Sequence, residues 1–253
     1  MAWTPLTSLE GKVAVVIGGA GGIGAASSRL LAQAGAVVAI GYHGGAERAE
    51  RLAIDLPGQG HLALKVDLED SATLEAMARA VQARLGRADV LVNAAGMTRA
   101  VPHADLVGLD DALIDQVFAA NWRGPFAAIR AFEPLLRASG AGVVVNVSSI
   151  SASTGKGSSV VYCAAKAGLD TLTKSLARAL GPAIRLVCVS PAAVATDFVP
   201  GRGREDVEKQ AAGSPLRTVA EPEHVAGAIL ACVTHLPLTT GSVIQVDGGR
   251  HLV

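Results

Sequence analysis

The stretch Val13-Ala14-Val15-Val16-Ile17-Gly18-Gly19-Ala20-Gly21-Gly22-Ile23-Gly24 passes from an uninterrupted apolar run into a turn with five glycines. The apolar run predicts a strand buried on both faces, and the spacing of apolar residues over 25–34 predicts a helix after the turn. Glycine lets the backbone approach a pyrophosphate closely, and a helix N-terminus offers unpaired N–H groups and a positive dipole end. A turn without a ligand would explain the glycines alone, but the strand before them and the helix after them favour dinucleotide binding.

Six further apolar runs alternate with amphipathic segments along the 253-residue chain. Strands are expected at 37–40, 62–66, 90–92, 143–147, 185–189 and 243–246, and further helices at 71–85, 111–137, 161–180 and 223–233. Strands that are apolar throughout need cover on both faces, which the crossover helices of a parallel sheet provide. We therefore expect a single doubly wound α/β domain over residues 1–253. The Gly-, Pro- and charge-rich segment 196–217 is expected to be a mobile loop at the substrate site.

Composition excludes several classes of function. The 22 basic and 22 acidic residues balance, and no run of Lys or Arg gives the basic patch of a nucleic-acid-binding protein. No apolar stretch reaches the roughly 18 residues that a membrane span needs. Cys163, Cys188 and Cys232 are too few and too scattered for a disulfide framework or a metal site. These features predict a soluble, cytoplasmic protein that acts on a small molecule, with no metal and no nucleic-acid or membrane partner.

Tyr162 and Lys166 are four residues apart on one expected helix, so their side chains are neighbours on one face. An ammonium close to a phenol favours the phenolate, so Lys166 is expected to lower the pKa of Tyr162 from its ordinary value of about 10. A pair that merely stabilises the helix is the alternative for this spacing alone. Ser149, at the end of the fifth expected strand, lies upstream of the pair.

These motifs together resemble the short-chain dehydrogenase/reductase family, and within it the 3-oxoacyl-carrier-protein reductases and their relatives. The resemblance covers essentially the whole chain. It rests on Gly18, Gly22 and Gly24, on Asn93-Ala94-Ala95-Gly96, on Asn121, on Ser149 with Tyr162 and Lys166, and on Thr240-Gly241 followed by Val246-Asp247-Gly248-Gly249. It implies a Rossmann fold with strand order 3-2-1-4-5-6-7. The family usually has Thr where this chain has Ile17, and that hydroxyl is thought to brace the turn.

The resemblance also implies roles for the catalytic residues. Tyr162 would be the general acid/base, Ser149 would hydrogen-bond the substrate oxygen, and Lys166 would hydrogen-bond the nicotinamide ribose. Asn121 would hold a water that links Lys166 to solvent, although a purely structural contact is an alternative for this Asn. The implied reaction reduces a ketone or 3-oxoacyl group to an alcohol. An NAD-dependent alcohol or sugar dehydrogenase and a catalytically silent cofactor-binding regulator are the competing hypotheses.

The end of the second strand favours NADP(H), with NAD(H) possible. An acidic residue there selects NAD in the family, but this chain has Gly41-Tyr42-His43. His43 stands where NADP-preferring relatives often carry Arg, yet a neutral His is a weak phosphate ligand, and sequence alone does not place Arg48 beside it. Tyr42 and His43 are alternatively ordinary strand-end residues.

The remaining cofactor contacts follow from the resemblance. Asp67 is expected at the adenine, with helix capping as its alternative. Pro191, Val194 and Thr196 are expected near the nicotinamide carboxamide, with Ala192 in place of the usual Gly. The other expected contacts are Gly18, Gly22, Ile23, Gly24, Leu68, Asn93, Ala94 and Gly96, together with Tyr162 and Lys166.

Family habit further suggests a homotetramer built on the helices at 111–137 and 161–180. Carrier-protein reductases usually carry docking arginines that this chain lacks at the matching places. Arg137 and Arg185 are possible substitutes, but they are more simply interpreted as a helix C-terminal cation and a strand-edge residue.

Overall fold

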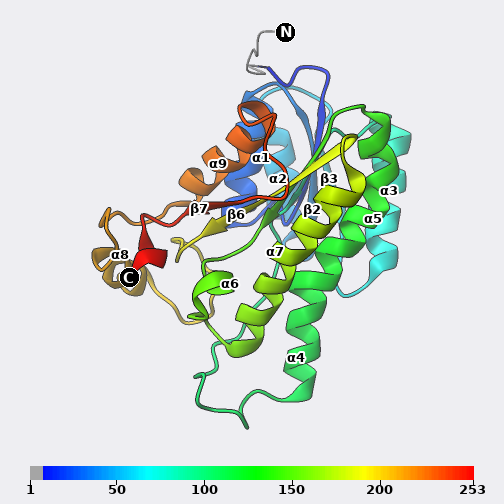
Figure 1. Cartoon of the computed structure of the whole chain (residues 1–253). Helices are drawn as coiled ribbons and strands as arrows, with labels where there is room; N and C mark the ends of the chain where they lie inside the picture. The colour runs from blue at the N-terminus through cyan, green and yellow to red at the C-terminus, as the bar shows by residue number, and fades with distance from the viewer. Residues whose placement is uncertain (1–7) are drawn as a thin grey trace.

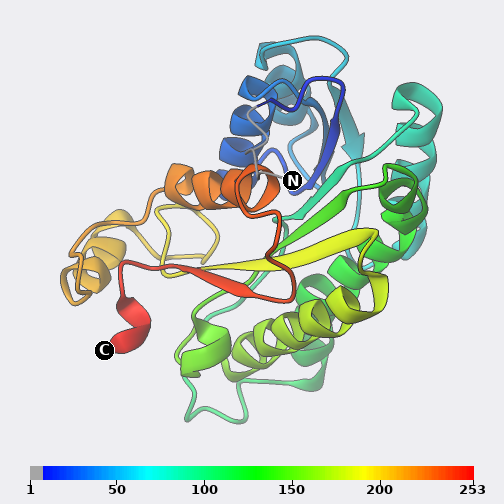
Figure 2. The same cartoon turned by 45° about the horizontal axis from the view of Figure 1, so that its top comes forward.

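The computed structural model describes residues 8–253 and contains one seven-stranded parallel sheet (Figures 1 and 2). Its strand order, β3-β2-β1-β4-β5-β6-β7, confirms the expected order. The five residues of the first strand are all buried, as its uninterrupted apolar run predicts. The strands are β1 (Val13–Ile17), β2 (Val37–Tyr42), β3 (Leu62–Lys65), β4 (Val90–Asn93), β5 (Gly142–Val147), β6 (Ile184–Pro191) and β7 (Val243–Val246).

Helices cover both faces of the sheet (Figure 1). One hydrophobic cluster joins α1, α2 and α9 to alternate strand residues such as Val16 and Ile40, and a second joins α3, α5 and α7 to residues such as Val15 and Ile17. Neighbouring strand residues thus face opposite layers. The longer helices are α1 (Gly22–Gln33), α2 (Ala46–Asp55), α3 (Ser71–Leu85), α4 (Asp111–Phe118), α5 (Gly124–Ala138), α7 (Val160–Leu180), α8 (Arg204–Ala212) and α9 (Pro222–Thr234), and the short ones are α6 (Ser151–Thr154) and the 3₁₀ turn Arg250–Leu252.

The structure corrects three sequence expectations. The helix expected over 111–137 is divided into α4 and α5 by a π-helical turn, Ala119–Arg123. The segment 196–217, expected to be a loop, contains α8. The sixth strand continues two residues beyond Val189, so Pro191 ends β6 rather than following it.

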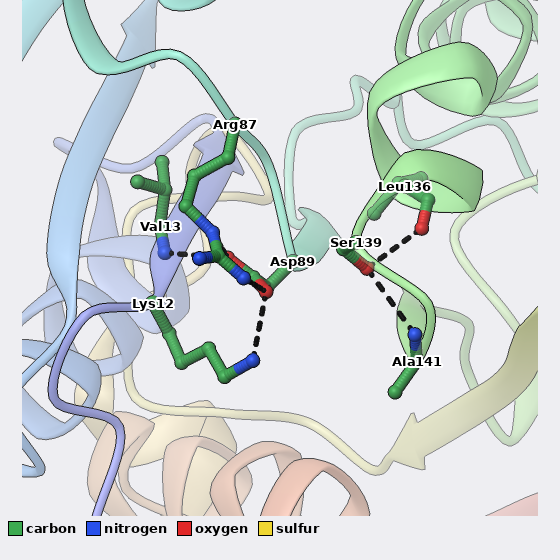
Figure 3. A network of polar contacts seen from close by, with 7 residues as sticks. All are labelled: Lys12, Val13, Arg87, Asp89, Leu136, Ser139 and Ala141. Atoms are coloured by element: carbon green, nitrogen blue, oxygen red, sulfur yellow. Dashed lines mark hydrogen bonds and ion pairs between the residues drawn. The ribbon is translucent and has the colours of Figure 1, made fainter.

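A buried carboxylate, that of Asp89, links β1 to β4 at the amino ends of the strands. Asp89 immediately precedes β4 and accepts hydrogen bonds from the backbone N–H of Val13, from Lys12 and from Arg87 (Figure 3). Its side chain is only 6% exposed. Burial alone would raise the pKa of this carboxyl, but the bonds from Arg87, Val13 and Lys12 outweigh burial and hold the pKa below its ordinary value.

We expect Asp89→Asn to lower the free energy of unfolding by about 1–3 kcal/mol at pH 7, because charge-assisted bonds to a buried group are lost. The pKa of Asp89 is lower in the folded than in the unfolded protein, so its ionised carboxylate stabilises the fold fully at pH values above the unfolded-state pKa, near 4. This stabilisation is lost as the pH falls through the folded-state pKa. Urea denaturation at pH 7 and at pH 3 measures the loss of stability and its dependence on pH. The difference between the two proteins should shrink at pH 3, and the exposed control Asp55→Asn should change stability little at either pH.

The three cysteines are free and buried, as expected for small apolar residues. Across residues 8–253, the helices are too short or too polar to cross a membrane. In the same part of the chain, no three His, Cys, Asp or Glu side chains gather closely enough to hold a metal ion.

Candidate active site

The glycine turn forms the floor of a cleft of about 700 Å³ at the carboxyl ends of the strands. Its backbone is held by β2, because the N–H groups of Gly18 and Gly19 both donate to the carbonyl of Gly41. The Ser28 hydroxyl donates to the Gly19 carbonyl at 3.1 Å, which braces the turn although Ile17 carries no hydroxyl. Helix α1 begins at Gly22 with its N-terminus at the cleft, where N–H groups and the helix dipole favour an anion such as a pyrophosphate.

The end of the cleft beside β2 carries a cation, Arg48, and a histidine, His43. Tyr42, His43 and Gly44 line it together with Arg48 on α2. The fold therefore brings Arg48 beside His43, a position that the sequence alone did not predict. His43 is largely exposed and lies 3.7 Å from Asp67, measured from Nε2 to Oδ2. Asp67 is not the cap of α3, since that helix is capped by Asp70, whose side chain accepts from the N–H of Ala72.

The other end of the cleft is formed by the segments that follow β4 and β6. Ala94, Ala95 and Gly96 follow β4, and Thr196 crosses over the glycine turn so closely that a Cβ on Gly22 would fall 2.6 Å from Thr196 Cγ2. Pro191 and Val194 line the adjoining cavity. These expected contacts are therefore brought together.

Several other expected cofactor contacts line neither cavity in the described part of the chain: Gly24, Asp67, Leu68 and Asn93. A Cβ on Gly24 would overlap the Gly18 carbonyl oxygen, so this glycine permits the turn to pack on its own helix. Asn93 donates to Asn146 at 2.8 Å and thereby joins β4 to β5 inside the sheet. Leu68 packs where Gly124 begins α5. Gly24, Asn93 and Leu68 therefore support the backbone around the cleft and do not line it.

Tyr162, Ser149 and Lys166 line a second cavity, of about 350 Å³, which adjoins the cleft. Helix α7 begins at Val160 after Ser159, whose hydroxyl accepts from the N–H of Tyr162. Lys166 Nζ donates to the Val147 carbonyl at 2.8 Å and lies 5.7 Å from the centre of the Tyr162 ring. The helix therefore places the phenol and the ammonium on one face, as their spacing predicts.

The pKa of Tyr162 differs from expectation. Burial raises it to about 12, and the effects that oppose burial come from the nearby Ser149 hydroxyl and from Arg202, not from Lys166. Burial also lowers the pKa of Lys166 to about 8. Lys166 is not among the groups that shift this pKa, because both side chains are buried and desolvation is the largest effect. Tyr162 is thus held as a phenol, which suits a proton donor.

Asn121 lies in the π-helical turn between α4 and α5. Its Nδ2 donates to the carbonyls of Met97 and Val117, which fixes the orientation of the amide. Within residues 8–253, its buried Oδ1 has no hydrogen-bond partner. A Cβ on Gly96 would fall 2.5 Å from that oxygen and 3.8 Å from Lys166 Nζ, so glycine is needed here for the backbone to pack against the Asn121 amide beside Lys166. A buried acceptor without a protein partner suits a water.

Sequence reasoning missed the residues that the segment 196–217 brings to the cavity. Phe198 lies 6.0 Å from Tyr162 between ring centres, and Arg202 lines both the cleft and the cavity. Arg250 reaches the cavity from the C-terminal 3₁₀ turn. The unusual composition of 196–217 marks the segment, but no spacing in the sequence identifies these side chains individually.

Several known proteins are similar to this chain. A family model described as enoyl-(acyl carrier protein) reductase matches residues 18–251. Cis-4-hydroxycyclohexanecarboxylate dehydrogenase of Sinomonas cyclohexanicum is 38% identical over 242 residues, which cover 94% of this chain and 96% of that protein. A 3-oxoacyl-(acyl-carrier-protein) reductase of Staphylococcus aureus is 30% identical over 245 residues, 95% of this chain and 98% of that protein. The crystal structure of a dehydrogenase/reductase from Sinorhizobium meliloti is 33% identical, covers 96% of both chains and has a TM-score of 0.86.

Proposed function

Because the chain belongs to the short-chain dehydrogenase/reductase family, we propose that it is an NADP(H)-dependent oxidoreductase that reduces a ketone or 3-oxoacyl carbonyl to an alcohol. One observation carries the proposal. Ile23, Thr196 and the segment from Ala94 to Gly96 line both the cleft at the glycine turn and the cavity that contains Tyr162. A dinucleotide whose pyrophosphate lies at the N-terminus of α1 would therefore have its nicotinamide end at the phenol.

The proposed mechanism assigns each proton to an atom. When bound, the nicotinamide supplies a hydride to the carbonyl carbon. Tyr162 donates its phenolic proton to the carbonyl oxygen, while the Ser149 hydroxyl donates a hydrogen bond to the same oxygen. Lys166 would orient the nicotinamide ribose. The raised pKa of Tyr162 keeps the proton available at neutral pH until the carbonyl oxygen gains negative charge.

Asn121 supports the proposed proton supply. Its buried Oδ1, which has no partner among the described residues, would accept a hydrogen bond from a water that connects Lys166 to solvent and resupplies Tyr162 after each turnover.

Arg48 and His43 support a preference for NADPH. The Arg48 cation at the β2 end of the cleft would attract a 2′-phosphate, His43 could donate a hydrogen bond to it, and the end of β2 holds no carboxylate to repel it. Asp67 opposes this preference through its contact with His43, so the proposal rests chiefly on Arg48.

We expect Arg48→Gln to lower kcat/KM for NADPH by about tenfold, equivalent to about 1.4 kcal/mol, and to leave kcat/KM for NADH nearly unchanged. Initial rates with each cofactor measure the ratio. The matched control is Arg51→Gln on the same helix, because Arg51 is exposed and lies outside the lining of the cleft. A wild-type preference for NADH, or an equal loss with both cofactors, would contradict the assignment.

A panel of ketones and 3-oxoacyl thioesters, assayed with both cofactors, tests the proposed function. Consumption of NADPH with a member of the panel supports a reductase, whereas binding of NADPH without consumption favours a silent regulator. Turnover confined to alcohols and NAD favours the dehydrogenase hypothesis, to which the name of the Sinomonas relative lends support.

The arginines considered for carrier-protein docking have structural partners. Arg185 donates to the carbonyls of Cys232, Leu236 and Thr239, and Arg137 pairs with Glu133. This favours a free small molecule over a carrier-bound acyl chain as the substrate.

We also propose that the protein assembles as a homotetramer and that the segment 196–217 moves when substrate enters. Phe118 and Trp122, at the junction of α4 and α5, are partly exposed apolar side chains on the helices expected to form the interface. Phe198 and Arg202 place the segment directly over Tyr162, where movement would open the cavity.

A further inference from the structure

The cavity around Tyr162 is lined by cations. Lys156, Lys166, Arg202 and Arg250 contribute to it, whereas no Asp or Glu side chain is present among its lining residues within 8–253. Three of these cations have partners in the chain: Lys166 donates to Val147, Arg250 to the Gly213 carbonyl, and Lys156 to the main-chain oxygen of Val253, which also lines the cavity. Arg202 also has a partner, but one of its buried N–H groups is left unpaired among the described residues.

Arg202 presents a guanidinium that is incompletely satisfied. Its Nη2 donates to the Val194 carbonyl at 3.3 Å, but its buried Nε has no partner among the described residues. Desolvation by burial lowers the pKa of Arg202, and the effects that oppose it come first from Tyr162 and then from Asp206, whose carboxylate accepts a bond from the N–H of Gly203. Leaving a buried donor unpaired is costly, which indicates that a ligand completes this site.

The position of Arg202 defines which part of a ligand it would meet. Arg202 and Tyr162 line the same cavity, and Phe198, four residues before Arg202, lies 6.0 Å from Tyr162 between ring centres. A cavity of about 350 Å³ holds a small molecule in contact with both groups. The phosphates of a pantetheine-type thioester lie many bonds from the reacting carbonyl and would not reach a cation beside Tyr162.

We propose, building on the proposed function, that Arg202 binds the carboxylate of a small oxo acid whose ketone is reduced at Tyr162. The guanidinium donates two N–H groups to the carboxylate, a geometry that arginine provides and lysine does not. The reduction is balanced without the carboxylate: the ketone carbon gains hydride, its oxygen gains the Tyr162 proton, and NADPH becomes NADP⁺. The carboxylate fixes the orientation of the substrate, so Arg202 is a specificity-determining residue.

The test compares oxo acids of different chain length with their methyl esters, using NADPH and three variants. The unsubstituted protein should prefer an acid over its ester. Arg202→Gln should lower kcat/KM for that acid by 10- to 100-fold and change kcat/KM for the ester by less than threefold. Arg202→Lys should retain part of the preference. The control Lys209→Gln, which removes an exposed charge from α8 outside the cavity, should retain all of it.

Other results would overturn the inference. Preference for the ester, or an acid preference that survives Arg202→Gln, removes the carboxylate role. An equal loss for acid and ester with weaker NADPH binding, measured by NADPH fluorescence, would assign Arg202 to the cofactor. Preference for 3-oxobutanoyl-coenzyme A over every free acid would identify a distant phosphate as the anion instead.

A failure of the proposed function can be recognised separately. If the protein reduces the esters but shows no acid preference, the reductase proposal survives and the Arg202 inference fails. If it reduces no ketone, calorimetric titration of the NADP⁺-loaded protein with the oxo acids decides the inference alone. Binding that Arg202→Gln weakens at least tenfold would support the anion site, and absence of binding to the unsubstituted protein would overturn it.

Discussion

Tyr162→Phe should lower kcat by about a thousand-fold, within the range that a general acid contributes, while the dissociation constant for NADPH changes by less than threefold. The substitution removes only the hydroxyl. The phenyl ring keeps its place between Phe198, 6.0 Å away, and Lys166, 5.7 Å away, so the packing of the cavity is preserved. Stopped-flow turnover, NADPH fluorescence titration and thermal unfolding measure the three quantities separately.

The pH dependence adds a second check on Tyr162. Reduction needs the phenol, which a pKa of about 12 maintains throughout the neutral range, so titration of Tyr162 itself should not change the rate of reduction there. Oxidation needs the phenolate, so its rate should rise with pH until the phenol has titrated, at a lower pH when the positively charged oxidised cofactor is bound. A variant that keeps more than a tenth of the wild-type kcat would remove Tyr162 from the proposed role.

Local sequence was sufficient to predict the sheet because its strands are apolar on both faces. Val13–Ile17 and Val243–Val246 have the bounds that were expected, and Ser71–Leu85 begins after Asp70 and ends before Gly86, a residue with positive φ. Helices α2 and α8 were not predicted because each buries only two residues, Ala49 and Leu52 in α2 and Val207 and Ala211 in α8. Two apolar positions in a polar segment do not distinguish a helix from a loop.

The pKa of Tyr162 and the backbone at Asn121 could not be predicted from the sequence, because both depend on tertiary contacts. Spacing alone identified Tyr162 and Lys166 as neighbours, but the pKa of the phenol depends on burial, which spacing does not contain. Likewise, the π-helical turn forms where the Asn121 side chain takes the Val117 carbonyl and the N–H of Gly124 bonds back to Ala119, five residues earlier. Apolar periodicity continues through this turn, so the sequence pattern predicts one helix.

Gly18→Ala should lower the free energy of unfolding by about 2–4 kcal/mol and weaken NADPH binding more than tenfold. Gly18 has a φ of +79°, which costs other residues about 1–2 kcal/mol. A Cβ there would also fall 2.8 Å from the backbone N and Cα of Ala95, and overpacking of this kind costs about 1–3 kcal/mol more. Because Gly18 and Ala95 both line the cofactor cleft, any backbone shift that relieves this clash alters the cleft itself.

Two further glycines separate the effect on folding from the effect on binding. Gly227→Ala, on an exposed part of α9 with open space around the new methyl, should raise stability by about 0.5–1 kcal/mol, so a loss at Gly18 would not be a general effect of glycine replacement. Gly22→Ala meets only the Thr196 side chain, which can move, so this variant should fold and yet bind NADPH more weakly. Urea denaturation and NADPH titration of all three variants test the argument. If Gly18→Ala were as stable as the wild type and bound NADPH equally well, the turn would not be the rigid phosphate-binding element that its hydrogen bonds to β2 indicate.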